Sequence, residues 1–81
     1  MRSMIETKAE HENACSEFVK ARDFEQAALS AARAAECGFA LAQRTTGAIS
    51  EAHTEDAEGW LELAADLKKR AAEGGRNGPA D

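Results

Sequence analysis

Alanine constrains this chain more than any other residue, because it occupies 19 of the 81 positions. Alanine has the strongest helix propensity, but its side chain buries little apolar area. Only 14 residues are large and apolar, and residues that favour strands are scarce, with one Val and no Tyr. We therefore expect an all-α fold with closely packed helices and a thin core.

The length and the charge of the chain exclude several classes of protein. Eighty-one residues give room for one small domain, and the net charge of −5 argues against a surface that neutralises nucleic-acid phosphates. No apolar stretch approaches the roughly 20 residues of a membrane span, and no apolar segment of a signal peptide opens the chain. We expect a cytoplasmic protein that contacts neither nucleic acid nor membrane directly.

The first half of the sequence predicts a hairpin of two helices. The first helix is expected from Ser3 or Met4 to Lys20, with one stripe formed by Met4, His11, Ala14, Cys15 and Phe18. Asp23 is expected to cap a second helix that ends at Gly38. Because so few residues separate the two helices, they should fold back antiparallel.

The second half predicts two more helices, which gives a small antiparallel bundle of about four. The third is expected from Phe39 to Ala52, with Gly47 in its middle, and Thr54 is expected to cap the fourth. The apolar stripe of the fourth helix is Trp60, Leu63, Ala64, Leu67 and Ala71. Residues 1–73 then form one helical domain, and the glycine-rich residues 74–81 form a flexible tail.

The segment from Ala14 to Ala35 resembles a tetratricopeptide repeat. In that family an aromatic residue ends the first helix, a Gly-Asp-aromatic turn follows, and alanines let the helices meet closely. The matching positions here are Phe18, Asp23, Phe24, Ala27 and Ala34. The resemblance covers residues 8–41, Arg22 stands at the turn glycine, and the pattern does not recur after Ala42. We expect repeat-like packing of one hairpin, not an array of repeats.

The resemblance implies that a partner would bind the inner face of the first helix. The matching positions are Ala9, Glu12, Ser16, Val19 and Lys20. We add Phe39 and Trp60 as candidate contacts, because large aromatic residues often anchor interfaces. For Trp60, a place in the core is the simpler interpretation.

Neither catalysis nor metal binding is favoured by the remaining residues. Cys15 and Cys37 lie at different heights of the predicted hairpin, so we expect two buried free thiols. His11 and Cys15 could present two metal ligands on one helix face, with His53 as a distant third, but a structural site needs about four. We predict no cofactor, no metal and no catalytic residue.

Three hypotheses of function follow. The leading one is a non-catalytic helical protein–protein interaction module, an adaptor or regulator, which could pair with itself as a homodimer. The second is a small acidic inhibitor, of the kind that phages encode, which blocks a basic or nucleic-acid-binding surface of a target protein. The third, a metal-binding or catalytic bundle, depends on His11, Cys15 and His53.

Overall fold

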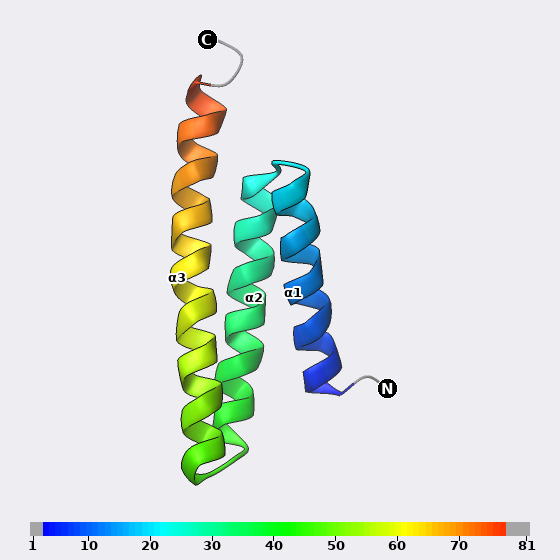
Figure 1. Cartoon of the computed structure of the whole chain (residues 1–81), viewed down its shortest axis with the longest axis vertical. Coiled ribbons are helices and arrows are strands. Elements are labelled where there is room, and N and C mark those ends of the chain that lie inside the picture. The colour runs from blue at the N-terminus through cyan, green and yellow to red at the C-terminus, as the bar shows by residue number, and fades with distance from the viewer. Residues whose placement is uncertain (1–2, 78–81) are drawn as a thin grey trace.

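The computed structural model describes residues 3–77 as three helices, with side chains described for residues 3–73. Helix α1 spans Met4–Lys20, α2 spans Phe24–Gln43 and α3 spans Gly47–Asn77. Figure 1 shows the three helices side by side, with α2 between α1 and α3 and each helix antiparallel to the next. The all-α prediction is confirmed, and no strand occurs within residues 3–77.

The start of α1 is fixed by a capping box. The Ser3 hydroxyl accepts a hydrogen bond from the Glu6 backbone N–H at 3.2 Å, and the Glu6 carboxylate accepts one from the Ser3 backbone N–H at 3.0 Å. Hydrogen bonding from the Ser3 backbone N–H, and next from the Ser3 side chain, holds the pKa of the exposed Glu6 carboxyl below its usual range. The predicted start at Ser3 or Met4 and the predicted end at Lys20 are both confirmed.

The turn between α1 and α2 places Arg22 in an unusual conformation. Its φ of 60° lies in the left-handed region, where a glycine has no steric penalty. Asp23 then caps α2 as predicted, because its carboxylate accepts from the Gln26 backbone N–H at 3.3 Å. The turn therefore keeps the geometry that a glycine would favour, although the residue is an arginine.

The predicted four helices are wrong, because α2 does not end at Gly38. It continues through Phe39, Leu41 and Ala42 to Gln43, and the side of Gly38 without a Cβ faces α3. A Cβ built at Gly38 would lie 2.8 Å from the Cβ of Ala57, so the glycine permits close approach of two helices instead of ending one. The predicted third helix over 39–52 therefore belongs to α2, to a turn and to α3.

The actual turn lies at residues 44–46, and two hydroxyl groups complete the end of α2. Thr45 Oγ1 donates to the Leu41 carbonyl at 3.0 Å, and Ser50 Oγ donates to the Ala42 carbonyl at 2.8 Å. Both carbonyls belong to the last turn of α2, whose carbonyl groups have no hydrogen-bond donors within the helix. Gly47 was predicted to lie in the middle of a helix. It instead begins α3, with a φ of +64°.

Thr54 does not cap a helix, which corrects another prediction. It lies inside α3, and its hydroxyl donates to the Ser50 carbonyl at 2.9 Å, one turn earlier. Helix α3 reaches Asn77, which is four residues into the segment 74–81 that was predicted as a tail. Residues 78–81 lie outside the described part of the chain.

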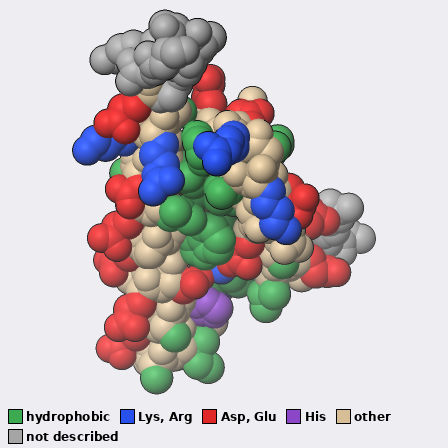
Figure 2. Space-filling view, turned by 45° about the horizontal axis from the view of Figure 1, so that its top comes forward, with side chains coloured by type: hydrophobic (Ala, Val, Ile, Leu, Met, Phe, Trp, Pro, Cys, Tyr) green, Lys and Arg blue, Asp and Glu red, His purple; other side chains and the backbone are tan. Residues whose placement is uncertain are grey.

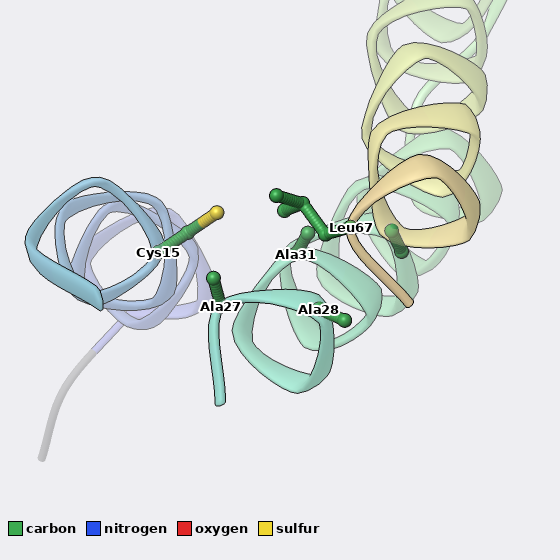
Figure 3. Close-up of a cluster of buried hydrophobic side chains, with 6 residues drawn as sticks. Cys15, Ala27, Ala28, Ala31 and Leu67 are labelled. Carbon is green, nitrogen blue, oxygen red and sulfur yellow. The ribbon is translucent and has the colours of Figure 1, made fainter. Parts of the chain in front are cut away.

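The core is a seam of small side chains along α2. Its buried residues are Ala27, Ala28, Ser30, Ala31, Ala34, Ala35, Gly38 and Ala42. Figure 3 shows Cys15 of α1 and Leu67 of α3 pointing toward one another above Ala31 of α2. Among the described residues, Leu67 is the one large aliphatic side chain in the buried set, at 4% exposure.

The two positive-φ positions give a matched prediction for stability. Arg22→Gly should raise the free energy of unfolding by up to about 1 kcal/mol, because glycine adopts this conformation without a Cβ clash. Gly47→Ala should lower it by about 1 kcal/mol, although no atom lies within 4 Å of the added Cβ, because the penalty is in the backbone. Urea unfolding at equal protein concentration measures both, and equal shifts of the same sign would contradict this account.

Candidate interaction surface

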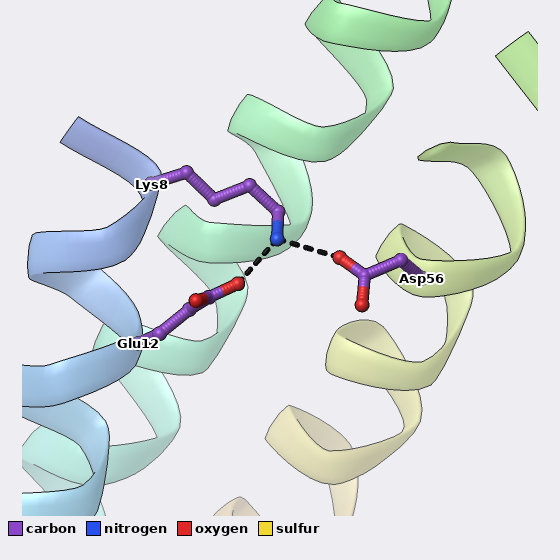
Figure 4. Close-up of polar contacts among 3 residues, drawn as sticks. All are labelled: Lys8, Glu12 and Asp56. Atoms are coloured by element: carbon purple, nitrogen blue, oxygen red, sulfur yellow. Dashed lines mark hydrogen bonds and ion pairs between the residues drawn. The ribbon is translucent and has the colours of Figure 1, made fainter. Parts of the chain in front are cut away.

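Lys8 joins α1 to α3 and crosses α2 at the level of Gly38. Its Nζ lies 2.6 Å from an Asp56 carboxylate oxygen and also pairs with Glu12 on its own helix, as Figure 4 shows. The same Nζ lies 6.0 Å from the centre of the Trp60 ring, within the range of a cation–π contact. Three described residues of α1 and α3 therefore converge on one ammonium group.

The surroundings of Lys8 raise the pKa of its ammonium group. Its side chain is only 13% exposed, and burial alone would lower the pKa of its ammonium group. Hydrogen bonds and charges from Asp56 and Glu12 outweigh burial and raise the pKa above its ordinary value of 10.5. Lys8 thus stays charged in the folded protein and holds α1 against α3.

Lys8 is not among the predicted contact residues, although its position in the sequence carries a signal. Lys8 lies one turn after Met4 and one turn before the half-buried His11 and Glu12, so it falls on the inward stripe of α1. A charged residue on such a stripe needs an opposite charge, and Asp56 is distant in the sequence. Because Lys8 and Asp56 are far apart in the sequence, residue spacing alone did not predict their ion pair.

The raised pKa values of Lys8 and Cys15 predict a loss of stability in alkali. Burial raises the pKa of the Cys15 thiol above its ordinary 9.0, as the two carboxylates raise that of Lys8 above 10.5. Both groups then lose protons at lower pH in the unfolded chain than in the folded one. The free energy of unfolding should be unaffected by these groups below pH 9.0 and should fall in two stages as the pH rises above 9.0 and then 10.5.

The variant Lys8→Met separates the two stages, because it retains most of the aliphatic length without the charge. Urea midpoints measured from about pH 7 to about pH 11 should show that the variant loses the upper stage and keeps the lower one. An upper stage of the same size in both proteins would contradict the role of Lys8.

The predicted contact residues of α1 fall on one flank of that helix. Glu12, Ser16 and Val19 follow one another at spacings of four and three, so they share the side from which Lys8 and Glu12 reach toward α3. Ser16 and Val19 are exposed, whereas Glu12 is half-buried by its pairing with Lys8. Lys20 is exposed and lies 3.5 Å from Glu17, and Ala9 is exposed on the same helix.

The two aromatic candidates are separated in the structure. Trp60 lies half-buried on α3 and packs against the core, next to Lys8. Phe39 is half-buried on α2, and neither the Lys8 contacts nor the core cluster includes it. The structure therefore brings Glu12 and Trp60 together, whereas Phe39 has no part in that group.

We call the surface between α1 and α3 the α1–α3 face, defined by Lys8, Phe18 and Trp60, which lie over the buried Cys15 and Leu67. Figure 2 shows a hydrophobic area between α3 and the rest of the molecule, with Lys and Arg beside it toward the C-terminal end of α3. Phe18 and Trp60 pack on the buried cluster and are themselves only partly buried. No described element of the chain covers this face.

One predicted core residue lies at the edge of the α1–α3 face instead. Leu63 was expected in the inward stripe of α3, but its side chain is 38% exposed, and Ala57 is fully buried in the seam. Helices α2 and α3 approach each other closely at Gly38, so the space opposite it admits only a small side chain such as that of Ala57. Together with Glu55, Asp56, Gly59 and Trp60, Leu63 lines a shallow depression on α3.

The remaining chemistry is limited within the described residues. Cys15 and Cys37 are both free thiols, with Cys15 buried and Cys37 only half-buried, which corrects the prediction of two buried thiols. Residues 3–73 contain no group of three or more His, Cys, Asp or Glu side chains that could hold a metal ion. His11 and His53 are each half-buried on different helices. Among the described helices, none is both long enough and apolar enough to cross a membrane.

Comparisons with known proteins add no assignment. No family model, no curated protein and no solved structure matches this chain. The resemblance of residues 8–41 to a tetratricopeptide repeat therefore stays a prediction.

Proposed function

We propose that this chain is a non-catalytic helical interaction module that binds a second copy of itself. The observation that carries the proposal is the uncovered α1–α3 face, on which the aromatic side chains of Phe18 and Trp60 are only partly buried above a core of small residues. Exposed Leu63 extends this apolar surface along α3. Contiguous apolar surface of this kind is typical of interaction sites.

The shape of the molecule supports the same proposal. The Cα extents are 50 × 25 × 13 Å, so the chain forms a thin slab instead of a closed bundle. The radius of gyration is 14.2 Å, compared with about 12 Å expected for a compact domain of this length. A chain so thin gains burial when a second layer of helices packs on it.

The charge pattern favours a second copy over the acidic inhibitor hypothesis. An inhibitor that imitates nucleic acid needs an acidic face, but the C-terminal part of α3 carries the basic residues Lys68, Lys69 and Arg70. Both signs of charge on one helix are instead what a self-complementary interface requires.

Thermal unfolding over a protein concentration series tests the proposal. For a folded dimer that unfolds to monomers, the midpoint rises with concentration, because mass action favours the associated state. We expect a rise of several degrees over about a hundredfold increase in concentration. A midpoint that does not change with concentration would overturn the proposal.

A further inference from the structure

The charges of α3 are segregated along its length. Residues 45–67 contain six acidic residues and no Lys or Arg, and three basic residues follow directly. The acidic residues are Glu51, Glu55, Asp56, Glu58, Glu62 and Asp66, and the basic residues are Lys68, Lys69 and Arg70. Such a helix is complementary to an antiparallel copy of itself.

The helix dipole does not account for this segregation. A charge interacts appreciably with the dipole only in the first or the last turn. Helix α3 begins at Gly47 with no acidic residue in its first turn, and Arg70 lies seven residues before its last residue, Asn77. Within residues 3–73 the structure gives no ion pair to Lys68, Lys69 or Arg70. The basic cluster therefore has no ion-pair partner within residues 3–73.

One face of α3 joins these charges to an exposed apolar residue. Asp56, Gly59, Leu63, Asp66 and Arg70 recur at spacings of three and four, so they form one stripe, which we call the Leu63 stripe. It borders the α1–α3 face, because Asp56 reaches Lys8 and because Leu63 and Trp60 line the same depression.

Gly59 is the least expected residue of the Leu63 stripe. A glycine inside a helix costs about 1 kcal/mol relative to alanine. Apart from the adjacent residues and the nearby backbone of α3, no described atom lies within 4 Å of a Cβ built at Gly59, so no described neighbour requires its small size. A close approach by another chain would require it.

We infer that α3 pairs antiparallel with α3 of a second copy, about a twofold axis close to Leu63, through the Leu63 stripe. This inference rests on the proposed self-association and specifies its surface. Asp56 and Arg70 lie two turns on either side of Leu63, so Arg70 of each copy meets Asp56 and Glu55 of the other beside Gly59. A parallel pair would place acidic segments against each other, which is unfavourable.

The opposite side of α3 provides a matched control surface. Leu61 is more exposed than Leu63, at 51%, and with Glu58, Glu62 and Ala65 it lines a second shallow depression. This side does not border the α1–α3 face, so a pairing through it would leave Trp60 uncovered. Lys69 is adjacent to Arg70 but projects about 100° away around the helix.

Disulfide cross-linking tests the position of the axis. A residue close to a twofold axis lies close to its own copy, so Leu63→Cys in a Cys37→Ser background should form a covalent dimer under mild oxidation. Leu61→Cys in the same background should react at least about tenfold more slowly, although its side chain is more exposed. Circular dichroism confirms that both variants are folded.

The outcomes separate this inference from the proposed function. Equal or faster cross-linking of Leu61→Cys in a protein whose unfolding midpoint depends on concentration would overturn the axis and keep the self-association. No cross-linking at either position, together with a midpoint independent of concentration, would overturn both.

A charge reversal tests the second contact of the Leu63 stripe. Arg70→Glu should weaken the dimer at least about tenfold, and adding Glu55→Arg should restore part of the loss. Lys69→Glu makes the same change of charge one residue away and should weaken the dimer much less. Sedimentation measurements of the dissociation constant compare the variants, and equal losses in Arg70→Glu and Lys69→Glu would overturn the assignment of Arg70.

Discussion

Replacement of Leu67 by alanine should lower the free energy of unfolding by about 2–3 kcal/mol. Leu67 is 4% exposed and belongs to the cluster formed by Cys15, Ala31 and Ala64. The other buried members of that cluster are small side chains that cannot extend into the space that the substitution leaves. For a domain of this length the loss is a large part of a total stability of roughly 4–12 kcal/mol.

Leu61→Ala is the matched control for Leu67→Ala. Both substitutions remove the same atoms from α3, but Leu61 is 51% exposed and takes no part in the buried cluster. Its loss should stay within about 0.5 kcal/mol. Urea unfolding at equal concentration measures both variants, and similar losses at the two positions would show that Leu67 is not the anchor of α3.

The close contact between Gly38 and Ala57 should make α2 intolerant of any larger residue at position 38. Gly38→Ala places a Cβ 2.8 Å from the Ala57 Cβ and 3.3 Å from its Cα, so α2 and α3 must separate. We expect a loss of about 1–2 kcal/mol, in spite of the better helix propensity of alanine, and about 3 kcal/mol or more for Gly38→Val.

A double-mutant cycle separates this steric effect from helix propensity. The Ala57→Gly substitution removes the Cβ that would clash with a methyl group at position 38. In that background Gly38→Ala should therefore be neutral or stabilising. The coupling energy should be at least about 1 kcal/mol. Additive effects of the two substitutions, measured by urea unfolding, would contradict the close approach of the helices.

The sequence predicted the parts of the fold that local chemistry determines. The composition indicated helices, the stripe around Cys15 located α1, and Asp23 marked the start of α2. The prediction was wrong where a glycine has different roles in different surroundings. Gly38 could end a helix or permit close packing, and only the position of Ala57 on another helix decides between the two.

The candidate surface was predictable only in part, for a related reason. Helical spacing identified Glu12 and Trp60 as candidate contacts on separate helices, and Lys8 contacts both of them in the structure. Their role in binding a partner stays a prediction. The role of Lys8 depends on Asp56, which is far away in the sequence.

Leu63 was placed in the core because it stands at helical spacing from Trp60 and Leu67. Among the described helices, α3 packs on α2 alone, through a narrow seam of Ala57, Ala64 and Leu67, so the flank that carries Leu63 stays exposed. The number of neighbours that a helix has in the fold therefore decided which residues are exposed.

The molar mass of the chain in solution is the direct measure of its self-association. Light scattering coupled to size exclusion, run on the unmodified chain over a concentration series, should give a mass about twice 8.6 kDa at the higher concentrations. Arg70→Glu should shift the mass toward that of the monomer at the same concentrations, whereas Lys69→Glu should not. A mass of 8.6 kDa at every concentration would contradict the self-association on which the account depends.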